Sequence, residues 1–184
     1  MQTLPEFKRV VTGHDEHGQA IVASNGPTPN VFPLASVPGT VFHELWNSST
    51  SPALLDNASD PSSKPLQLSP GPLGSVIRVV DIPPDSVQDQ VSAESAAAVF
   101  AEIGQSHAGT GKADSRHKLM HRTETLDYGI VTEGEVWLYW TRKKCTSSAA
   151  TSWCNAAPTM PGATAPKRWR AWSSSCSTDA SRLS

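Results

Sequence analysis

Short stretches in which apolar and polar residues alternate, or in which Val and Ile gather, predict a chain built mainly of β-strands. Residues 40–46 and 75–82 are such stretches, and Gly or Pro residues bound each of them. Residues 9–23 contain two β-rich runs on either side of the polar segment 15–18. This order predicts a β-hairpin near the N-terminus.

One segment has helical spacing instead. The apolar residues of 92–103 favour one side of a helix, and Ser92 is a suitable N-cap. Residues 47–73 are rich in Ser, Pro, Asn and Asp and predict a long loop. Residues 117–139 predict two strands around a turn at 132–135. Short strands joined by Gly- and Pro-rich turns indicate an antiparallel barrel or jelly roll.

The strand pattern stops after residue 140. Residues 141–184 contain no Val, Ile, Phe, Tyr, His or Glu, and they hold 7 of the 15 Lys and Arg residues with a single acid. The first 140 residues therefore carry a formal charge of −8. Strands that close a barrel need β-branched and aromatic residues. We therefore expect one domain over 1–140 and a disordered or poorly packed tail over 141–184. An open edge of such an incomplete barrel would favour a homodimer.

Length and composition indicate a small cytoplasmic protein. The chain has 184 residues and a formal net charge of −2, which suits a single core. No apolar run is long enough to span a bilayer, and residues 1–11 lack the apolar segment of a signal peptide. The three cysteines lie in the tail at a spacing that matches no zinc or redox motif. We expect no membrane partner.

Candidate ligand residues lie at regular spacing before the break. His121, Thr123, Asp127 and Gly134 follow one another at intervals of two, four and seven residues. Positions two apart on a strand point to the same face, so their side chains converge inside a barrel. His and Asp are competent ligands for a divalent metal, whereas Thr is a weak one.

This spacing is similar to the first motif of the cupin superfamily: H-x-H, three or four residues, E, six residues, G. Thr123 stands at the second His of that motif and Asp127 at its Glu. The segments MHRTETLDYGIVTEGEVWL and RVVTGHDEHG closely resemble small single-domain fungal cupins. Such proteins are described as cupin-domain oxidoreductases of polyketide secondary-metabolite clusters, for example those making salicylaldehyde-type polyketides. The resemblance covers roughly residues 5–139.

The resemblance implies an all-β, cupin-type antiparallel β-barrel (jelly roll), incomplete here, with an N-terminal hairpin and one short helix. It also implies an oxidoreductase or other tailoring enzyme with a small-molecule polyketide substrate. His121 and Asp127 would be its catalytic and metal-binding residues, holding iron, manganese or zinc together with the His of a second motif. That metal would polarise a carbonyl or enol oxygen or bind dioxygen.

The second cupin motif reads G, five residues, P-x-G, two residues, H, three residues, N, but this chain has no His after His121. The codons of residues 149–166 can also be read in a shifted frame, in which the third base of each codon joins the first two bases of the next. In that frame they can encode G-D-V-V-V-Q-R-G-T-N-H-A-W-S-N-R-T. This string has the required spacing, with R for P. At Trp153 and Met160 the genetic code leaves no choice of base in the shifted frame, and the residue encoded at both places matches this string. We interpret the tail as a frameshifted reading of the missing half, with the shift near residue 140.

Alternatives accompany each of these interpretations. His121 and Asp127 are either metal or acid–base residues, or a hydrogen-bonded pair in the barrel interior. The chain is either an enzyme, a non-catalytic cupin that binds a small apolar metabolite, or an inactive frameshifted product. Residues 167–172 mix basic and aromatic side chains, but the shift of frame explains them better than a nucleic-acid partner. His117 could join the site along its strand or simply begin that strand, and the position of His43 is undecided.

Overall fold

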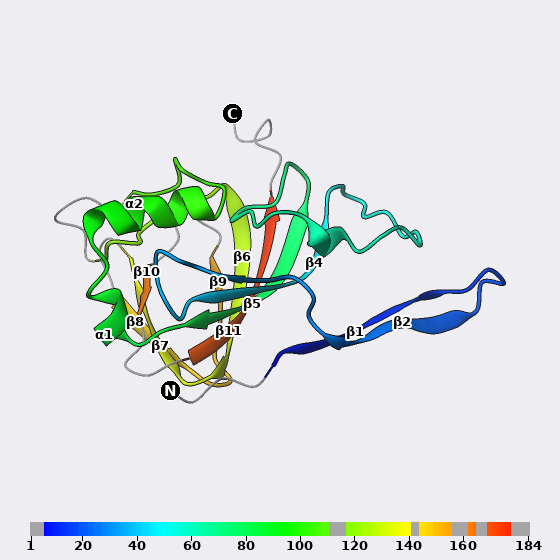
Figure 1. Ribbon diagram of the computed structural model, residues 1–184, viewed down its shortest axis with the longest axis horizontal. Helices are drawn as coiled ribbons and strands as arrows, with labels where there is room; N and C mark the ends of the chain where they lie inside the picture. Colours follow the sequence, from blue (N-terminus) through cyan, green and yellow to red (C-terminus); the bar gives the residue numbers. More distant parts are fainter. Residues whose placement is uncertain (1–5, 111–116, 141–143, 156–161, 165–168, 178–184) are drawn as a thin grey trace.

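The computed structural model describes residues 6–110, 117–140, 144–155, 162–164 and 169–177 (Figure 1). Its strands are β1 (Lys8–His14), β2 (Ala20–Pro27), β3 (Val31–Pro33), β4 (Val41–Ser48), β5 (Ser75–Ile82), β6 (Thr125–Glu133), β7 (Glu135–Tyr139), β8 (Lys144–Ser148), β9 (Ser152–Asn155), β10 (Gly162–Thr164) and β11 (Trp169–Ser177). Its helical elements are η1 (Pro61–Ser63), α1 (Asp85–Gln88) and α2 (Ala93–Glu102).

Two antiparallel sheets form the body of the molecule. The larger has the strand order β3-β4-β5-β11-β6-β9, and the smaller has the order β10-β7-β8. The helix α2 lies along one side of these sheets (Figure 1). Its buried residues join Phe42 of β4 in the main apolar cluster. The predicted all-β fold class with one short helix is confirmed, and α1 adds a single further turn.

The predicted N-terminal hairpin is a separate arm. Strands β1 and β2 pair only with each other in the described chain, and they project away from the sheets (Figure 1). We call residues 8–27 the arm. Its tight turn forms at Asp15, whose carboxylate accepts hydrogen bonds from the backbone N–H groups of His17 and Gln19 at 2.9 and 2.8 Å. Such side-chain-to-backbone bonds stabilise turns, because they replace bonds that a strand would supply.

The predicted strands at 40–46 and 75–82 are confirmed as β4 and β5. The predicted helix is confirmed as α2, and the hydroxyl of Ser92 accepts a hydrogen bond from the Ser95 N–H at 3.1 Å. This bond satisfies one of the donors that a helix start leaves unpaired. None of the described helices is long and apolar enough to cross a membrane.

The two strands expected within 117–139 are present as β6 and β7, but they are not a hairpin. In the described chain β6 pairs with β9 and β11, whereas β7 pairs with β8 and β10. Gly134, with a φ of 78°, lies between them. A Gly readily takes this left-handed conformation, which sends the chain from one sheet into the other.

The described parts of the tail form strands. Strands β8 to β11 come from residues after 140, and β11 lies between β5 and β6 in the larger sheet. Its backbone pairs with β5 from Trp169 opposite Ile82 to Cys176 opposite Ser75. The expectation that the tail over 141–184 is disordered or poorly packed stays a prediction. The boundary at residue 140 and the shift of frame concern the coding sequence and stay predictions.

Candidate functional site

The candidate residues from the sequence lie along one face of β6 and the segment before it. Thr123, Thr125 and Asp127 are all buried, while Tyr128 and Ile130 are 47 and 39% exposed. This is the alternation that a strand with one inward face produces. The Thr123 and Thr125 hydroxyls are 2.8 Å apart, and the Thr125 hydroxyl donates to Asp127 Oδ2 at 3.1 Å. The predicted spacing therefore does bring these side chains into one row.

His121 stands at the end of this row. Its backbone forms an antiparallel bridge with Gly109, and its ring contacts that of Phe100 on α2 at a centroid distance of 5.8 Å. The ring atom Nδ1 lies 2.9 Å from the carbonyl oxygen of Leu119. A carbonyl only accepts hydrogen bonds, so Nδ1 carries the proton and Nε2 holds the lone pair of the neutral ring.

Burial keeps this imidazole neutral. It lowers the pKa of His121 below its ordinary value of 6.5, because the charged form would lose its hydration. The bond to Leu119 and the negative charge of Asp127 act in the opposite direction and are smaller. Nε2 is buried and has no hydrogen-bond partner among the described residues. The result is an unprotonated ring nitrogen without a partner among the described residues, which suits a base or a metal ligand.

A buried arginine lies on the same inward side. The Nε atom of Arg78 on β5 is 2.8 Å from Glu44 Oε1 on β4, and the two side chains are only 5 and 6% exposed. Arg78 also donates to the backbone oxygens of Gln67 and Leu68 at 2.8 and 3.2 Å. No sequence pattern predicts this pair, because only the register of β4 with β5 places Glu44 opposite Arg78.

Burial and charge compete in this cluster. Loss of hydration raises the pKa of Glu44 and lowers that of Arg78, while their mutual attraction opposes both shifts. The carboxylate of Asp127 also acts on Arg78 and raises its pKa. The guanidinium therefore carries the positive charge between two buried carboxylates.

The described residues do not fit a resident metal. His121 offers a suitable ring nitrogen, but Thr123 is a weak ligand and the charge of Asp127 is already opposed by Arg78. A catalytic metal usually needs three protein ligands. Across the described ranges, no three His, Cys, Asp or Glu side chains gather closely enough to hold an ion. The predicted metal-binding role of His121 and Asp127 stays a prediction.

Of the remaining histidines, His107 is exposed, and the others fall into three groups. His43 is buried, and its Nε2 lies 3.2 Å from Asp81 Oδ2 in a pair that the sequence did not predict. His117 stacks on Tyr139 with a centroid distance of 5.9 Å, and burial lowers its pKa. The arm-tip histidines are exposed, as expected.

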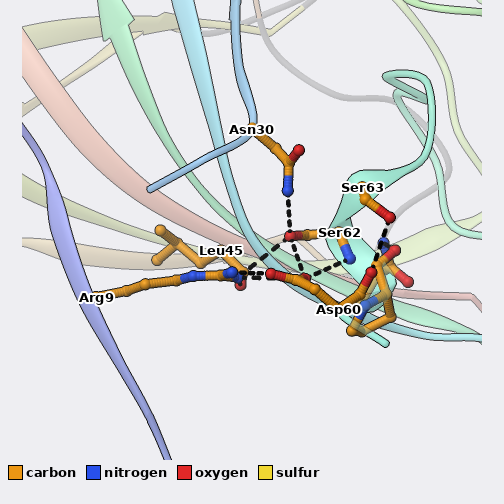
Figure 2. A network of polar contacts seen from close by, with 8 residues as sticks. Arg9, Asn30, Leu45, Asp60, Ser62 and Ser63 are labelled. Carbon is orange, nitrogen blue, oxygen red and sulfur yellow. Dashed lines mark hydrogen bonds and ion pairs between the residues drawn. The ribbon is translucent and has the colours of Figure 1, made fainter. Parts of the chain in front are cut away.

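A groove of about 480 Å³ lies elsewhere, beside the arm. It is lined by Phe7, residues 8–12, Leu45, Trp46 and Ile77. The network in Figure 2 fixes the base of the arm next to it. Arg9 makes an ion pair with Asp60, and Ser62 accepts hydrogen bonds from Arg9 at 3.2 Å and from Asn30 at 2.7 Å.

Two curated proteins of the fungus Diaporthe leptostromiformis are similar to the chain in sequence. They are phomopsin biosynthesis cluster protein C′ and phomopsin biosynthesis cluster protein D, each 33% identical over 141 residues. The chain is a relative of these fungal cluster proteins. The match covers 72% of this chain and 58% of each relative, so the chain spans less than two thirds of their length. No family profile matches the chain. The expected kinship with fungal secondary-metabolite cluster proteins is confirmed.

Several solved structures also resemble the chain, which is a relative of the phomopsin cluster proteins, but their sequence identity to it is much lower. A putative ethanolamine utilization protein Q of Salmonella typhimurium has a TM-score of 0.45 and 7% identity, over 95% of this chain and 99% of that one. The Schizosaccharomyces pombe Cnp3 cupin domain has a TM-score of 0.43 and 8% identity, over 92 and 87%. The iron(II) protein HppE has a TM-score of 0.41 and 12% identity, over 79 and 54%.

Proposed function

We propose that the chain is a tailoring protein of fungal secondary-metabolite biosynthesis that acts on a small polyketide-type molecule. The relatives named for a fungal biosynthesis cluster support the setting. The buried Nε2 of His121 supports a chemical role, because it has no hydrogen-bond partner among the described residues and such a group is unfavourable unless it is used.

The reaction proposed is proton abstraction by His121. One observation carries it: Nδ1 is tied to the Leu119 carbonyl, and the lone pair of Nε2 is buried with no partner among the described residues. The lowered pKa keeps that lone pair available at neutral pH. A carbon acid activated by two carbonyl groups, which polyketides commonly contain, is a suitable substrate class.

The oxidoreductase activity implied by the cupin resemblance is the second candidate. The observation that favours it is again His121, since a neutral imidazole with its other nitrogen bonded to a carbonyl is a typical metal ligand. It also needs further ligands, which the described residues do not bring together. Metal analysis of the purified protein therefore separates the two candidates.

A deuterium-exchange experiment tests the proposal. Benzoylacetone, a β-diketone, would be incubated with the protein in D2O, and loss of its acidic C–H signal would be followed by NMR. We expect faster exchange with the wild type and a loss of about 100-fold or more in the added rate with His121→Asn. His17→Asn changes an exposed histidine and serves as the control. Equal rates for wild type and His121→Asn would refute the proposal. Stoichiometric metal that is lost with His121→Asn would favour the oxidoreductase instead.

A further inference from the structure

The lone pair of His121 is closed off from solvent. Nε2 is buried and has no hydrogen-bond partner among the described residues, while Nδ1 lies 2.9 Å from the Leu119 carbonyl oxygen. A base acts only when another molecule comes within hydrogen-bond reach of its lone pair. A molecule can therefore reach Nε2 only after a neighbouring group has moved away from the ring.

The aromatic side chain of Phe100 lies against this imidazole. The two ring centroids are 5.8 Å apart, and the ring planes are inclined at 53°. Phe100 belongs to α2 and is only 5% exposed. Val99 and Ile103 are buried in the same apolar cluster and anchor the helix there. The contact with His121 makes the Phe100 side chain the first candidate for the group that moves.

Gly109 makes room for the Phe100 ring beside His121. A Cβ at position 109 would lie 2.8 Å from Cδ2 and 2.9 Å from Cε2 of that ring, which is closer than carbon atoms pack. The φ of Gly109 is not in the left-handed region, so other residues could adopt this backbone. The glycine therefore serves space and not conformation. The Phe100 ring occupies the place that a side chain at 109 would fill.

The backbone around this contact is fixed, which leaves the Phe100 side chain as the moving part. Gly109 forms a bridge with His121, and backbone hydrogen bonds of 2.8 and 2.9 Å flank that bridge. The carboxylate of Glu102 holds the end of α2, because it accepts from the N–H groups of residues 35 and 36 at 2.7 and 3.2 Å. A Phe side chain can rotate about two bonds while its backbone stays in place.

We propose that the Phe100 side chain is the gate of the His121 site, and that a flat ring with a hydroxyl group takes its place when it swings out. The place suits a flat ring, because a phenyl ring already lies there against a glycine backbone and an imidazole. The lone pair of Nε2 only accepts, so the incoming molecule must offer a proton, as a phenol or an enol does. Because the ligand would meet the same nitrogen, the gate rests on the proposed function, to which it adds the shape of the ligand.

Modification by diethyl pyrocarbonate tests the gate without depending on catalysis. The reagent acylates neutral imidazole nitrogens that it can reach, and peptide mass spectrometry of the full chain locates each modified histidine. In the wild type we expect His121 to react at least about tenfold more slowly than the exposed His17, because its reaction needs a local opening. Phe100→Ala and the milder Phe100→Leu should each raise the rate at His121 about tenfold.

Phe42 supplies the matched control. It is buried in the same apolar cluster, and its ring lies under the guanidinium of Arg78. Phe42→Ala and Phe42→Leu remove the same atoms from the core, so they report any increase that comes from a loosened fold alone. Circular dichroism shows which variants are folded. The gate is overturned if His121 of the wild type reacts as fast as His17, or if the Phe100 variants react no faster there than the Phe42 variants.

Three small molecules test the ligand class in Phe100→Ala, where the place of the ring is open. Phenol is flat and has a hydroxyl group, cyclohexanol keeps the hydroxyl group on a puckered ring, and toluene keeps the flat ring without it. We expect phenol to slow the modification of His121 about threefold when it occupies most of the sites, and the other two to protect little at the same concentration. Equal protection by cyclohexanol overturns the preference for a flat ring, and equal protection by toluene overturns the need for a hydroxyl group.

The gate and the proposed base can fail separately. If the Phe100 variants expose His121 but His121→Asn exchanges benzoylacetone as fast as the wild type, the gate stands and proton abstraction fails. If exchange depends on His121 but neither Phe100 variant alters its modification, proton abstraction stands and the gate fails.

Discussion

Replacing Arg78 by methionine tests how the barrel interior is held together. In the wild type, Arg78 and Glu44 are 2.8 Å apart and nearly fully buried. At an effective dielectric of about 20, the attraction at this distance is about 6 kcal/mol before the loss of hydration is subtracted. Removing the guanidinium leaves Glu44 without that partner and takes a neutralising charge from Asp127. It also takes a donor from the carbonyls of Gln67 and Leu68.

Breaking one side of a buried ion pair destabilises a protein by about 3–5 kcal/mol. That is a large part of the 5–15 kcal/mol by which a domain is usually stable. With an m-value of about 2 kcal/mol/M, the urea midpoint of Arg78→Met should fall by about 2 M. Arg122→Met removes an exposed arginine and should change the midpoint little. Adding Glu44→Met to Arg78→Met should recover much of the loss, because it removes the stranded carboxylate.

The reasoning is refuted if the free energies of unfolding of Arg78→Met and Arg122→Met differ by less than 1 kcal/mol. The Arg78–Glu44 ion pair would then not behave as a buried one. It is also refuted if the double variant is less stable than Arg78→Met. In that case the carboxylate of Glu44 would be satisfied by groups other than the guanidinium.

Four further predictions follow from the described contacts and from the sequence. Because the pKa of His121 in the folded chain lies below 6.5, the unfolded chain binds a proton that the folded one excludes. The free energy of unfolding should therefore fall as the pH drops below about 6.5. Urea unfolding should show a smaller fall in His121→Asn than in the control His17→Asn. In Gly109→Ala the new Cβ would lie 2.8 Å from an aromatic ring of α2, so we expect a loss of about 1–3 kcal/mol, against little change for Gly26→Ala, which has open space. Asp60→Asn should weaken the ion pair at the base of β1 and speed proteolysis within the arm without lowering the melting temperature of the body. Sequencing the coding DNA across codons 136–150 should show that restoring one base opens the second cupin motif; an intact frame there would rule out the shift.

Much of the fold can be predicted from the sequence, because local patterns determine where individual strands and the helix form. The two strands β4 and β5 have their own bounding Gly or Pro residues, and α2 has its own cap at Ser92. The pairing of distant strands is different, since it depends on register and not on any local pattern. For that reason the entry of β6 and β7 into different sheets was not predicted, nor was the place of β11 between β5 and β6.

The candidate site divides in the same way. The period-two spacing from His121 to Asp127 predicts a shared face, and the structure shows the row buried between them. The residues near Arg78 in the sequence do not predict its partner, because Glu44 lies more than thirty residues away. The two residues meet only through the pairing of β4 with β5, whose register contains a bulge. The tautomer of His121 is likewise set by a carbonyl, which no pattern of side chains reveals.

The position of β11 has a consequence for how the protein is made. Strands β5 and β6 are both synthesised long before β11, yet β11 lies between them in the sheet. At about 5–20 residues per second, roughly 2–9 s pass on the ribosome between the end of β6 and the end of β11. During that interval the nascent chain carries an unfilled slot with two strand edges open. We therefore expect its yield in cells to depend on translation speed and on chaperones that shield such edges, more than on the stability of the finished barrel.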